Sequence, residues 1–351
     1  MSLISPLGWI YGRIAAVRNS LYDTNTFRSY PLGAPTISIG NITTGGTGKT
    51  PLVRYVAGIL ADGGEKVCVL TRGYGRRNES ERVLVSDGEN VLTDIEAAGD
   101  EPVELARRLL RKAIIIADAD RVSAAAWARK KFGITAFVLD DAFQHRRAGR
   151  DVDIVCIDAT DPFGNEMLIP AGRLREPLMG LSRADAVVVT RCELVEDIEQ
   201  LERRIDEFAP KANVFRSCTH LREFKRIGGS ERVDWDFSES AFAFAGVGNP
   251  AAFFSLLRNE NVNVAGTLAF RDHYDYAQRD IDRLESDARV AGAAALITTA
   301  KDAVKLEKLH SRIPCLAAII DIEIDRGKQF EKLITSSFSS AAPSYRPSSR
   351  P

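Results

Sequence analysis

Residues 40–51 read GNITTGGTGKTP, and this stretch decides the fold. A short apolar run (PTISIG, 35–40) precedes it and a helical pattern (50–61) follows it, so the chain predicts a strand, a glycine-rich turn and a helix in immediate succession. Glycines in such a turn let backbone N–H groups point inward at phosphate oxygens, and the helix N-terminus favours negative charge. The strict pattern has glycine at position 43, where this chain has Thr43, but the rest of the motif is present.

The loop predicts contacts to the phosphates of a nucleotide. The residues expected to bind ATP are Thr43, Thr44, Gly45, Gly46, Thr47, Gly48, Lys49 and Thr50. Within this set Lys49 would reach the β- and γ-phosphates, and the Thr50 hydroxyl would bind Mg²⁺. The other interpretation is a glycine-rich turn without a ligand.

Two adjacent carboxylates, Asp140 and Asp141, follow the apolar run at 135–139. In open α/β sheets ligands bind at the carboxyl ends of the strands, and a phosphate loop needs an acid there to hold its metal ion. These aspartates are therefore predicted metal ligands. A turn in which an aspartate only caps the chain is the alternative.

Short β-branched runs alternate with helical patterns, which indicates an α/β fold with a doubly wound, largely parallel sheet. Strands are expected at 35–40, 66–71, 113–117, 135–139, 152–157 and 185–189, and helices at 50–61, 102–111, 120–131 and 195–208. A smaller α/β unit follows, with strands near 240–246, 263–270, 294–298 and 315–322 and helices at 250–260, 278–291 and 327–338.

We expect four regions along the chain. They are an N-terminal amphipathic segment (1–30), a phosphate-loop domain (31–215), a smaller C-terminal α/β domain (216–338) and a tail (339–351) whose Ser and Pro content predicts disorder. A length of 351 residues fits two domains.

The composition of the chain excludes some classes of function. A net charge of −1 excludes a globally basic nucleic-acid binder, so no nucleic-acid partner is expected. The five cysteines are odd in number and form no CxxC pair, which predicts free thiols in a reducing compartment. No run of 18 apolar residues occurs, so a membrane-spanning helix is not expected.

Residues 7–21 can lie on a membrane instead. Apolar residues recur there at spacings of three and four, with Trp9 and Tyr11 beside them and Arg13 and Arg18 interspersed. Interfacial helices have this pattern, but so does a helix that packs on its own domain, and the residues alone leave both open.

Three classes of phosphate-loop protein remain: a kinase, a GTPase switch and a membrane-associated ATPase. The ATPase class usually has lysine before its first paired glycine, where this chain has Thr44. VTRCE (189–193) only distantly follows the base-reading motif of GTPases, because Arg191 replaces lysine and Glu193 replaces aspartate. A kinase must also activate an acceptor hydroxyl, and Asp100 could do so or could simply cap the helix at 102–111.

Nine motifs in series give the sequence a family resemblance. They are GNITTGGTGKTP (40–51), LTRGYGR (70–76), AGDEP (98–102), LDDAFQHR (139–146), PAGRLREP (170–177), VVVTRCE (187–193), FAGVGNPAAFF (244–254), FRDHY (270–274) and TTAKDAVKL (298–306). In this order they resemble the tetraacyldisaccharide 4'-kinase (lipid A 4'-kinase) family over about residues 6–306. Two departures are Ala142, where the family usually has glycine, and Ala300, where it often has glutamate.

The resemblance implies an activity and a set of residues. It implies transfer of the ATP γ-phosphate to the 4'-hydroxyl of tetraacyldisaccharide 1-phosphate, a step of lipid A biosynthesis that gives lipid IVA, at the cytoplasmic face of the bacterial inner membrane. It implies that Asp100 and His273 form a catalytic dyad beside Lys49, with the two domains closing over the substrate. It further implies Glu176 as a metal ligand besides Thr50, Asp140 and Asp141, and contacts to the substrate from Asn19, Arg72, Gln144 and His145.

Overall fold

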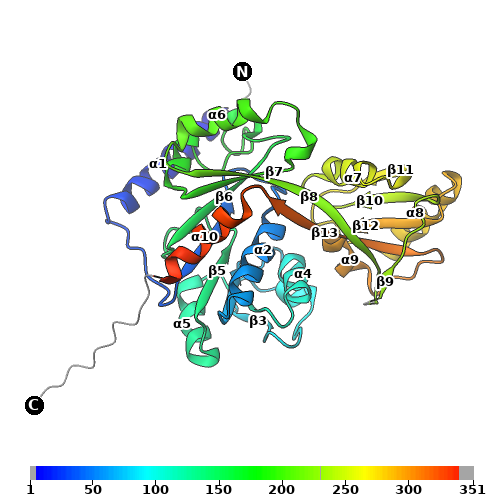
Figure 1. The fold of residues 1–351 in the computed structure, drawn as a ribbon, viewed down its shortest axis with the longest axis horizontal. Coiled ribbons are helices and arrows are strands. Elements are labelled where there is room, and N and C mark those ends of the chain that lie inside the picture. Colours follow the sequence, from blue (N-terminus) through cyan, green and yellow to red (C-terminus); the bar gives the residue numbers. More distant parts are fainter. Residues whose placement is uncertain (1–4, 230, 340–351) are drawn as a thin grey trace, which may run out of the picture.

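The computed structural model describes residues 5–229 and 231–339, which share one mixed sheet. The strand order is β11-β10-β12-β13-β8-β7-β6-β1-β5-β2-β4-β3, with β9 paired to the outer part of β8. Most neighbours are parallel, whereas β3 with β4, β8 with β13 and β8 with β9 are antiparallel. Figure 1 shows a larger unit around β5 and β6 and a smaller one around β10, joined through β8 and β13. The predicted α/β class is confirmed.

The larger unit contains the strands β1 (Thr36–Asn41), β2 (Val67–Thr71), β3 (Val83–Ser86), β4 (Ala113–Ala117), β5 (Ala136–Asp140), β6 (Val152–Asp158) and β7 (Ala186–Thr190). Its α-helices are α1 (Ser5–Asp23), α2 (Lys49–Asp62), α3 (Ile95–Ala98), α4 (Asp100–Arg108), α5 (Arg121–Phe132) and α6 (Ile198–Phe208). Short 3₁₀ turns lie at η1 (Gly164–Glu166), η2 (Leu178–Arg183) and η3 (Cys192–Leu194).

The remaining elements are β8 (Asn213–Arg226), β9 (Arg232–Val233), β10 (Ser240–Ala245), β11 (Asn263–Ala269), β12 (Ala295–Thr299) and β13 (Cys315–Ile324), with α7 (Pro250–Asn259), α8 (Gln278–Val290), α9 (Ala300–Leu306) and α10 (Gly327–Ser339). The strands predicted from apolar runs are all present within two residues of their expected bounds. The sequence did not predict β3, β8, β9, α3 or α9.

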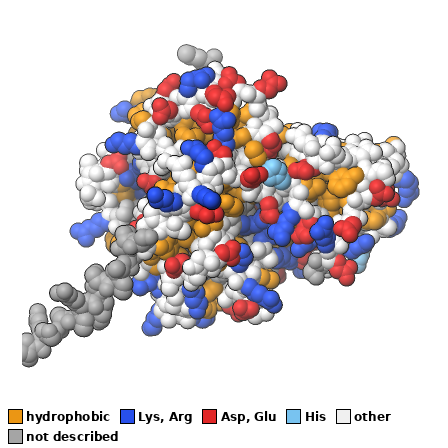
Figure 2. Space-filling model, viewed as in Figure 1, with side chains coloured by type: hydrophobic (Ala, Val, Ile, Leu, Met, Phe, Trp, Pro, Cys, Tyr) orange, Lys and Arg blue, Asp and Glu red, His pale blue; other side chains and the backbone are white. Residues whose placement is uncertain are grey.

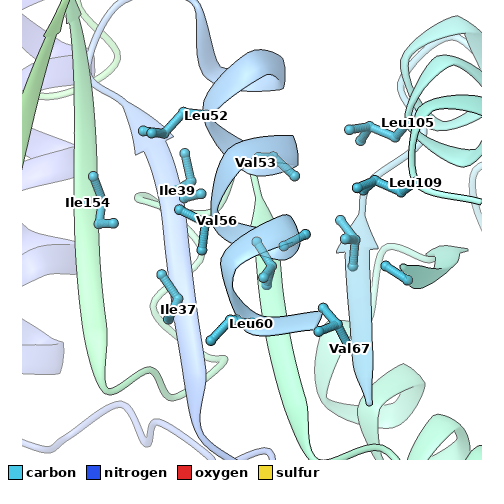
Figure 3. Close-up of a cluster of buried hydrophobic side chains, with 14 of the residues drawn as sticks. Ile37, Ile39, Leu52, Val53, Val56, Leu60, Val67, Leu105, Leu109 and Ile154 are labelled. Atoms are coloured by element: carbon cyan, nitrogen blue, oxygen red, sulfur yellow. The ribbon is translucent and has the colours of Figure 1, made fainter. Parts of the chain in front are cut away.

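Helix α2 places the glycine-rich loop on the sheet. Its apolar residues fall on one face, so Leu52, Val53, Val56 and Leu60 are all buried. Figure 3 shows them between β1, which contributes Ile37 and Ile39, and the side chains of α4. Burial of each such side chain contributes about 1.5–3 kcal/mol, which fixes the first turn of α2 against the carboxyl end of β1.

Strand β8 belongs to both units. Residues 213–217 pair in parallel with β7, and residues 217–226 pair in antiparallel fashion with β13. The predicted boundary between residues 215 and 216 therefore falls inside a strand. Helix α10 returns to the larger unit, where Phe330 lies 5.1 Å from Phe215 and 6.1 Å from Tyr55 between ring centroids (Figure 1). The predicted disordered tail lies, apart from Ser339, outside the described residues.

Acidic and basic side chains are interspersed over the face shown in Figure 2, in keeping with the net charge of −1. All five cysteines are free, with Cys68 and Cys156 buried and the other three half-buried.

Candidate active site

The glycine-rich loop is held by polar contacts from three neighbouring segments. Thr44 donates its N–H to the Arg173 carbonyl (2.7 Å), and the Arg173 guanidinium donates back to the Thr44 carbonyl (2.7 and 3.0 Å). Asn41 Nδ2 donates to Thr47 Oγ1 (3.0 Å), and Thr190 Oγ1 donates to the Thr47 carbonyl (3.0 Å). These contacts fix the loop against β1, β7 and the segment that contains Arg173.

Two glycines make the shape of this loop possible. Gly45 has a φ of 108° and Gly48 a φ of 78°, values that side chains disfavour. Gly46 lies against the loop after β10, where a Cβ on Gly248 would be 2.3 Å from the Gly46 nitrogen. The smaller unit therefore contacts the phosphate loop directly.

Asp141 follows β5 and faces two cations. Arg175 donates to both its carboxylate oxygens (2.8 and 2.9 Å), and Lys49 Nζ lies 3.4 Å away. Burial acts to raise the pKa of Asp141, but these two positive charges outweigh it and lower the pKa to about 2. Asp141 is thus an anion beside the loop lysine.

Asp140 is buried at the end of β5, with one carboxylate oxygen accepting from Thr71 Oγ1 (2.9 Å). Burial, followed by the negative charges of Glu101 and Asp141, raises the pKa of Asp140 to about 7. A divalent cation would relieve this repulsion. Thr50, Asp140 and Asp141 all line one cavity and offer only oxygen donors, which suits Mg²⁺.

Within the described part of the chain, no three His, Cys, Asp or Glu side chains form a metal-binding group. Mg²⁺ commonly takes only one or two carboxylates together with phosphate oxygens and water, so this geometry remains compatible with the ion. Glu176, the further predicted ligand, is buried among donors instead. Asn19 Nδ2, Gln144 Nε2 and Arg183 Nη2 lie 2.9 Å, 2.9 Å and 2.9–3.1 Å from its carboxylate.

Asp100 and His273 meet across the two units, although 173 positions separate them in sequence. His273 Nδ1 lies 3.0 and 3.2 Å from the Asp100 carboxylate oxygens. Asp100 does not cap α4, because Gly99 occupies that position and Asp100 begins the helix. The hydrogen bond to Asp100 raises the pKa of His273, whereas burial acts in the opposite direction.

Sequence reasoning missed two lysines at this pair. Lys305 Nζ lies 2.8 Å from Asp100 Oδ2, and Lys301 Nζ lies 3.3 Å from His273 Nε2. Both belong to the TTAKDAVKL motif, at an i, i+4 spacing that places them on one face of α9. The i, i+4 spacing of the two lysines was the signal present in the sequence. It does not indicate which side chains the lysines contact.

A cavity of about 770 Å³ joins these parts. Its walls include the phosphate loop, Asp140, Asp141 and His273, together with residues of α1, α7 and β13. Arg72 and Gln144, both predicted to bind substrate, line it, whereas Asn19 is directed to Glu176. His145 is half-buried, and burial together with the charges of Arg121 and Arg150 lowers its pKa to about 4.

Helix α1 closes one side of the cavity. Tyr11 Oη donates to the Arg175 carbonyl (2.8 Å), and Arg18 donates to the Gln144 carbonyl (3.0 Å). The helix also exposes large apolar side chains, namely Leu7, Trp9, Ile10, Ile14 and Val17, of which Ile14 also lines the cavity. No helix among the described residues is long and apolar enough to cross a membrane.

Comparison with known proteins identifies the family of the chain. Residues 1–339 match the family model of tetraacyldisaccharide-1-P 4'-kinase. The tetraacyldisaccharide 4'-kinase of Geobacter metallireducens is 39% identical over 341 residues, which cover 95% of this chain and 97% of that one. The enzyme of the same name from Halothermothrix orenii is 39% identical over 320 residues, covering 87% and 83%.

A solved structure is similar over nearly its whole length. The crystal structure of LpxK from Aquifex aeolicus in complex with ATP matches with a TM-score of 0.75 and 32% identity, covering 95% of this chain and 98% of that one. Match length, identity and fold all lead to the same assignment. The chain belongs to the tetraacyldisaccharide-1-P 4'-kinase family.

Proposed function

We infer that this protein is a kinase that uses ATP and Mg²⁺ to phosphorylate the 4'-hydroxyl of tetraacyldisaccharide 1-phosphate, giving lipid IVA in lipid A biosynthesis. The observation that carries this function is one cavity lined by both the phosphate loop and His273, whose ring pairs with the buried Asp100. A donor phosphate and an acceptor hydroxyl can then meet without water between them.

Phosphoryl transfer depends mainly on alignment and on neutralising charge at the γ-phosphate. The loop N–H groups and Lys49 would hold the phosphates, and Asp141 and Arg175 would keep the Lys49 side chain in place. Mg²⁺, held through Thr50 and the aspartate pair, would neutralise charge on the phosphate oxygens. Asp100 and His273 would remove the acceptor proton.

We assign the acceptor sugar and its phosphate to the cavity wall formed by Arg72 and Gln144. Glu176 supports this wall, because its carboxylate holds both Gln144 and Asn19. We propose that Glu176 and Asn19 order the substrate site in this way, and that His145 supports the Gln144 loop from behind. A carboxylate already taken by three donors is better suited to positioning than to binding a metal ion.

The apolar face of α1 supports a position at the cytoplasmic face of the bacterial inner membrane, as a peripheral or monotopic protein. A cavity wall formed by the same helix would let acyl chains remain in the lipid while the sugar enters. The GTPase alternative is not favoured. Arg191, at the base-reading position, is paired with Asp158, and Glu193 accepts the N–H of Thr219 (3.3 Å).

Purified protein should convert the disaccharide 1-phosphate to a bisphosphorylated lipid in detergent with Mg²⁺ and γ-labelled ATP. Asp100→Ala should lower kcat by roughly 10²–10⁴-fold and leave the ATP KM almost unchanged, because general base catalysis acts in the chemical step. Label appearing only as free phosphate, or GTP hydrolysis without lipid product, would exclude the kinase function. An unchanged kcat would exclude only the role of Asp100.

A further inference from the structure

Helix α9 directs two lysines at the Asp100–His273 pair. Lys305 Nζ lies 2.8 Å from Asp100 Oδ2, and the two side chains are only 7% and 5% exposed. Lys301 Nζ lies 3.3 Å from His273 Nε2 and also contacts Glu101 (3.0 Å) and Asp272 (3.3 Å). The pair is therefore part of a partly buried cluster of alternating charges that both units supply.

The donors and acceptors in this cluster define the state of the imidazole ring. A lysine ammonium can only donate hydrogen bonds, so His273 Nε2 must accept from Lys301. Burial acts to lower the pKa of Lys301, but the carboxylates of Glu101, Asp100 and Asp272 outweigh it and raise the pKa, which keeps the ammonium charged. The ring proton is then on Nδ1, where it is donated to Asp100.

We propose that Lys301 and Lys305 are positioning residues that hold His273 in its Nδ1–H form, with Nε2 as the atom that accepts the proton of the substrate hydroxyl. Lys305 fixes the Asp100 carboxylate as an anion that orients the ring. Lys301 occupies Nε2 until the acceptor hydroxyl replaces it. This inference rests on the proposed kinase function. It adds which nitrogen of His273 accepts the proton and which lysines keep that nitrogen unprotonated.

The step balances in protons and electrons. The acceptor oxygen forms its bond to the γ-phosphorus as the bond from that phosphorus to the ADP oxygen breaks, and ADP leaves with the electron pair. The hydroxyl proton passes to His273 Nε2. The imidazolium that results is stabilised by Asp100. Burial acts to raise the pKa of Asp100, but the hydrogen bond from His273 and the charges of Lys301 and Lys305 outweigh it and keep the carboxylate deprotonated.

Histidine NMR on the full-length protein tests the ring state without reference to activity. The chain has four histidines, so His273→Gln identifies the resonance. We expect the Nδ1–H tautomer in the unmodified protein. Lys301→Met and Lys305→Met should each raise the pKa of His273 by about one unit, because each removes a nearby positive charge. Lys305→Arg should leave it unchanged.

The charges facing the ring come from α4, α9 and the segment before α8: Asp100, Glu101, Lys301, Lys305 and Asp272. Arg107→Met provides the matched control, because Arg107 pairs with Glu307 across the same two units at a distance from the ring. It should leave the pKa of His273 unchanged. A shift of equal size in this control would mean that contact between the units, and not the lysine charge, sets the ring state.

The pH profile of kcat/KM provides the kinetic test. In both Lys→Met variants the acid limb should move to higher pH by about one unit, so the loss is roughly ten-fold at pH 6 and smaller at pH 9. A loss that is equal at every pH, or an Nε2–H tautomer in the unmodified protein, overturns the proposal. If the unmodified protein forms no lipid product, the proposed function fails, whereas the NMR result still decides the ring state.

Discussion

At the scale of single residues, two functional side chains have an unusual backbone. Asp141 has a φ of 50° and His273 a φ of 56°, in the left-handed region that costs non-glycine residues free energy. Each is held by ion pairs, Asp141 by Lys49 and Arg175 and His273 by Asp100. These ion pairs therefore stabilise a left-handed backbone conformation that is unfavourable for Asp141 and His273 by themselves.

Lys49 is the residue whose loss should be most damaging to catalysis. Lys49→Ala removes the charge that we propose lies next to the transferred phosphoryl group, so we expect turnover to fall by about 10²-fold or more. The measurement is formation of labelled lipid. Lys112→Ala is the control, because Lys112 forms an exposed ion pair with Asp62 (3.0 Å) and should retain full activity. Comparable activity in the two variants would contradict the role of Lys49.

His145 makes stability depend on pH. Its folded pKa of about 4 lies below the ordinary value of 6.5, so between these values the unfolded chain binds a proton that the folded protein does not. Stability should be complete above pH 6.5 and should fall by roughly 2 kcal/mol as the pH drops toward 4, after allowance for partial exposure of the ring.

Urea unfolding of the His145→Gln variant between pH 4.5 and 7 measures this effect. In the variant the free energy of unfolding should no longer show this decrease toward low pH. The His310→Gln variant, at an exposed histidine, should still show it. An identical slope in His145→Gln and the unmodified protein would show that His145 does not carry the effect.

At the scale of elements, α1 carries two different groups of side chains. Tyr11 and Arg18 donate hydrogen bonds to the cavity wall, and Leu7, Ile10, Ile14 and Val17 form an exposed apolar row beside them. Deleting the helix would therefore damage the site together with any membrane contact. Substitutions of Leu7, Ile10 and Val17, which do not line the cavity, separate these roles.

The triple variant Leu7→Ser, Ile10→Ser and Val17→Ser should bind vesicles of anionic phospholipid at least about ten-fold more weakly, because it removes exposed apolar area from the proposed interface. Activity on detergent-dispersed substrate should persist. Val290→Ser, at an 88% exposed valine on α8, is the matched control and should bind vesicles normally. If the triple variant and the unmodified protein bind vesicles equally well, the exposed apolar residues of α1 do not mediate membrane binding.

At the scale of the whole molecule, the site exists only where the two units meet. Asn249 Nδ2 donates to Asp158 (3.1 Å), Gly248 abuts Gly46, and Asp100 pairs with His273. Strands β8 and β13 join the units through one continuous sheet. Contact between the units therefore couples the phosphate loop to the residues that would activate the acceptor.

Gly248→Ala tests this coupling. The added Cβ would lie 2.3 Å from the Gly46 nitrogen, so the units must separate or the loop must shift. A misfit of this kind costs about 1–3 kcal/mol, and we expect kcat/KM to fall by roughly ten-fold with the fold intact. The control is Gly229→Ala, where the nearest atom is 3.8 Å away. Full activity of Gly248→Ala would mean that this contact is dispensable.

The sequence by itself determined the phosphate loop, the aspartate pair and the predicted strands, because each depends on residues that are close neighbours in the chain. It could not determine β8, whose polar residues do not alternate clearly and whose ends pair with different units. It also gave Asp100 two possible roles.

The pairing of His273 with Asp100 was implied only by the family resemblance, and the tertiary structure alone showed Lys305 beside Asp100 and Glu176 among three donors. These contacts join residues far apart in sequence, and they form because folding of the sheet brings the two units together. Periodicity and spacing report what adjacent residues do, whereas the partner of a buried charge depends on the packing of the whole chain.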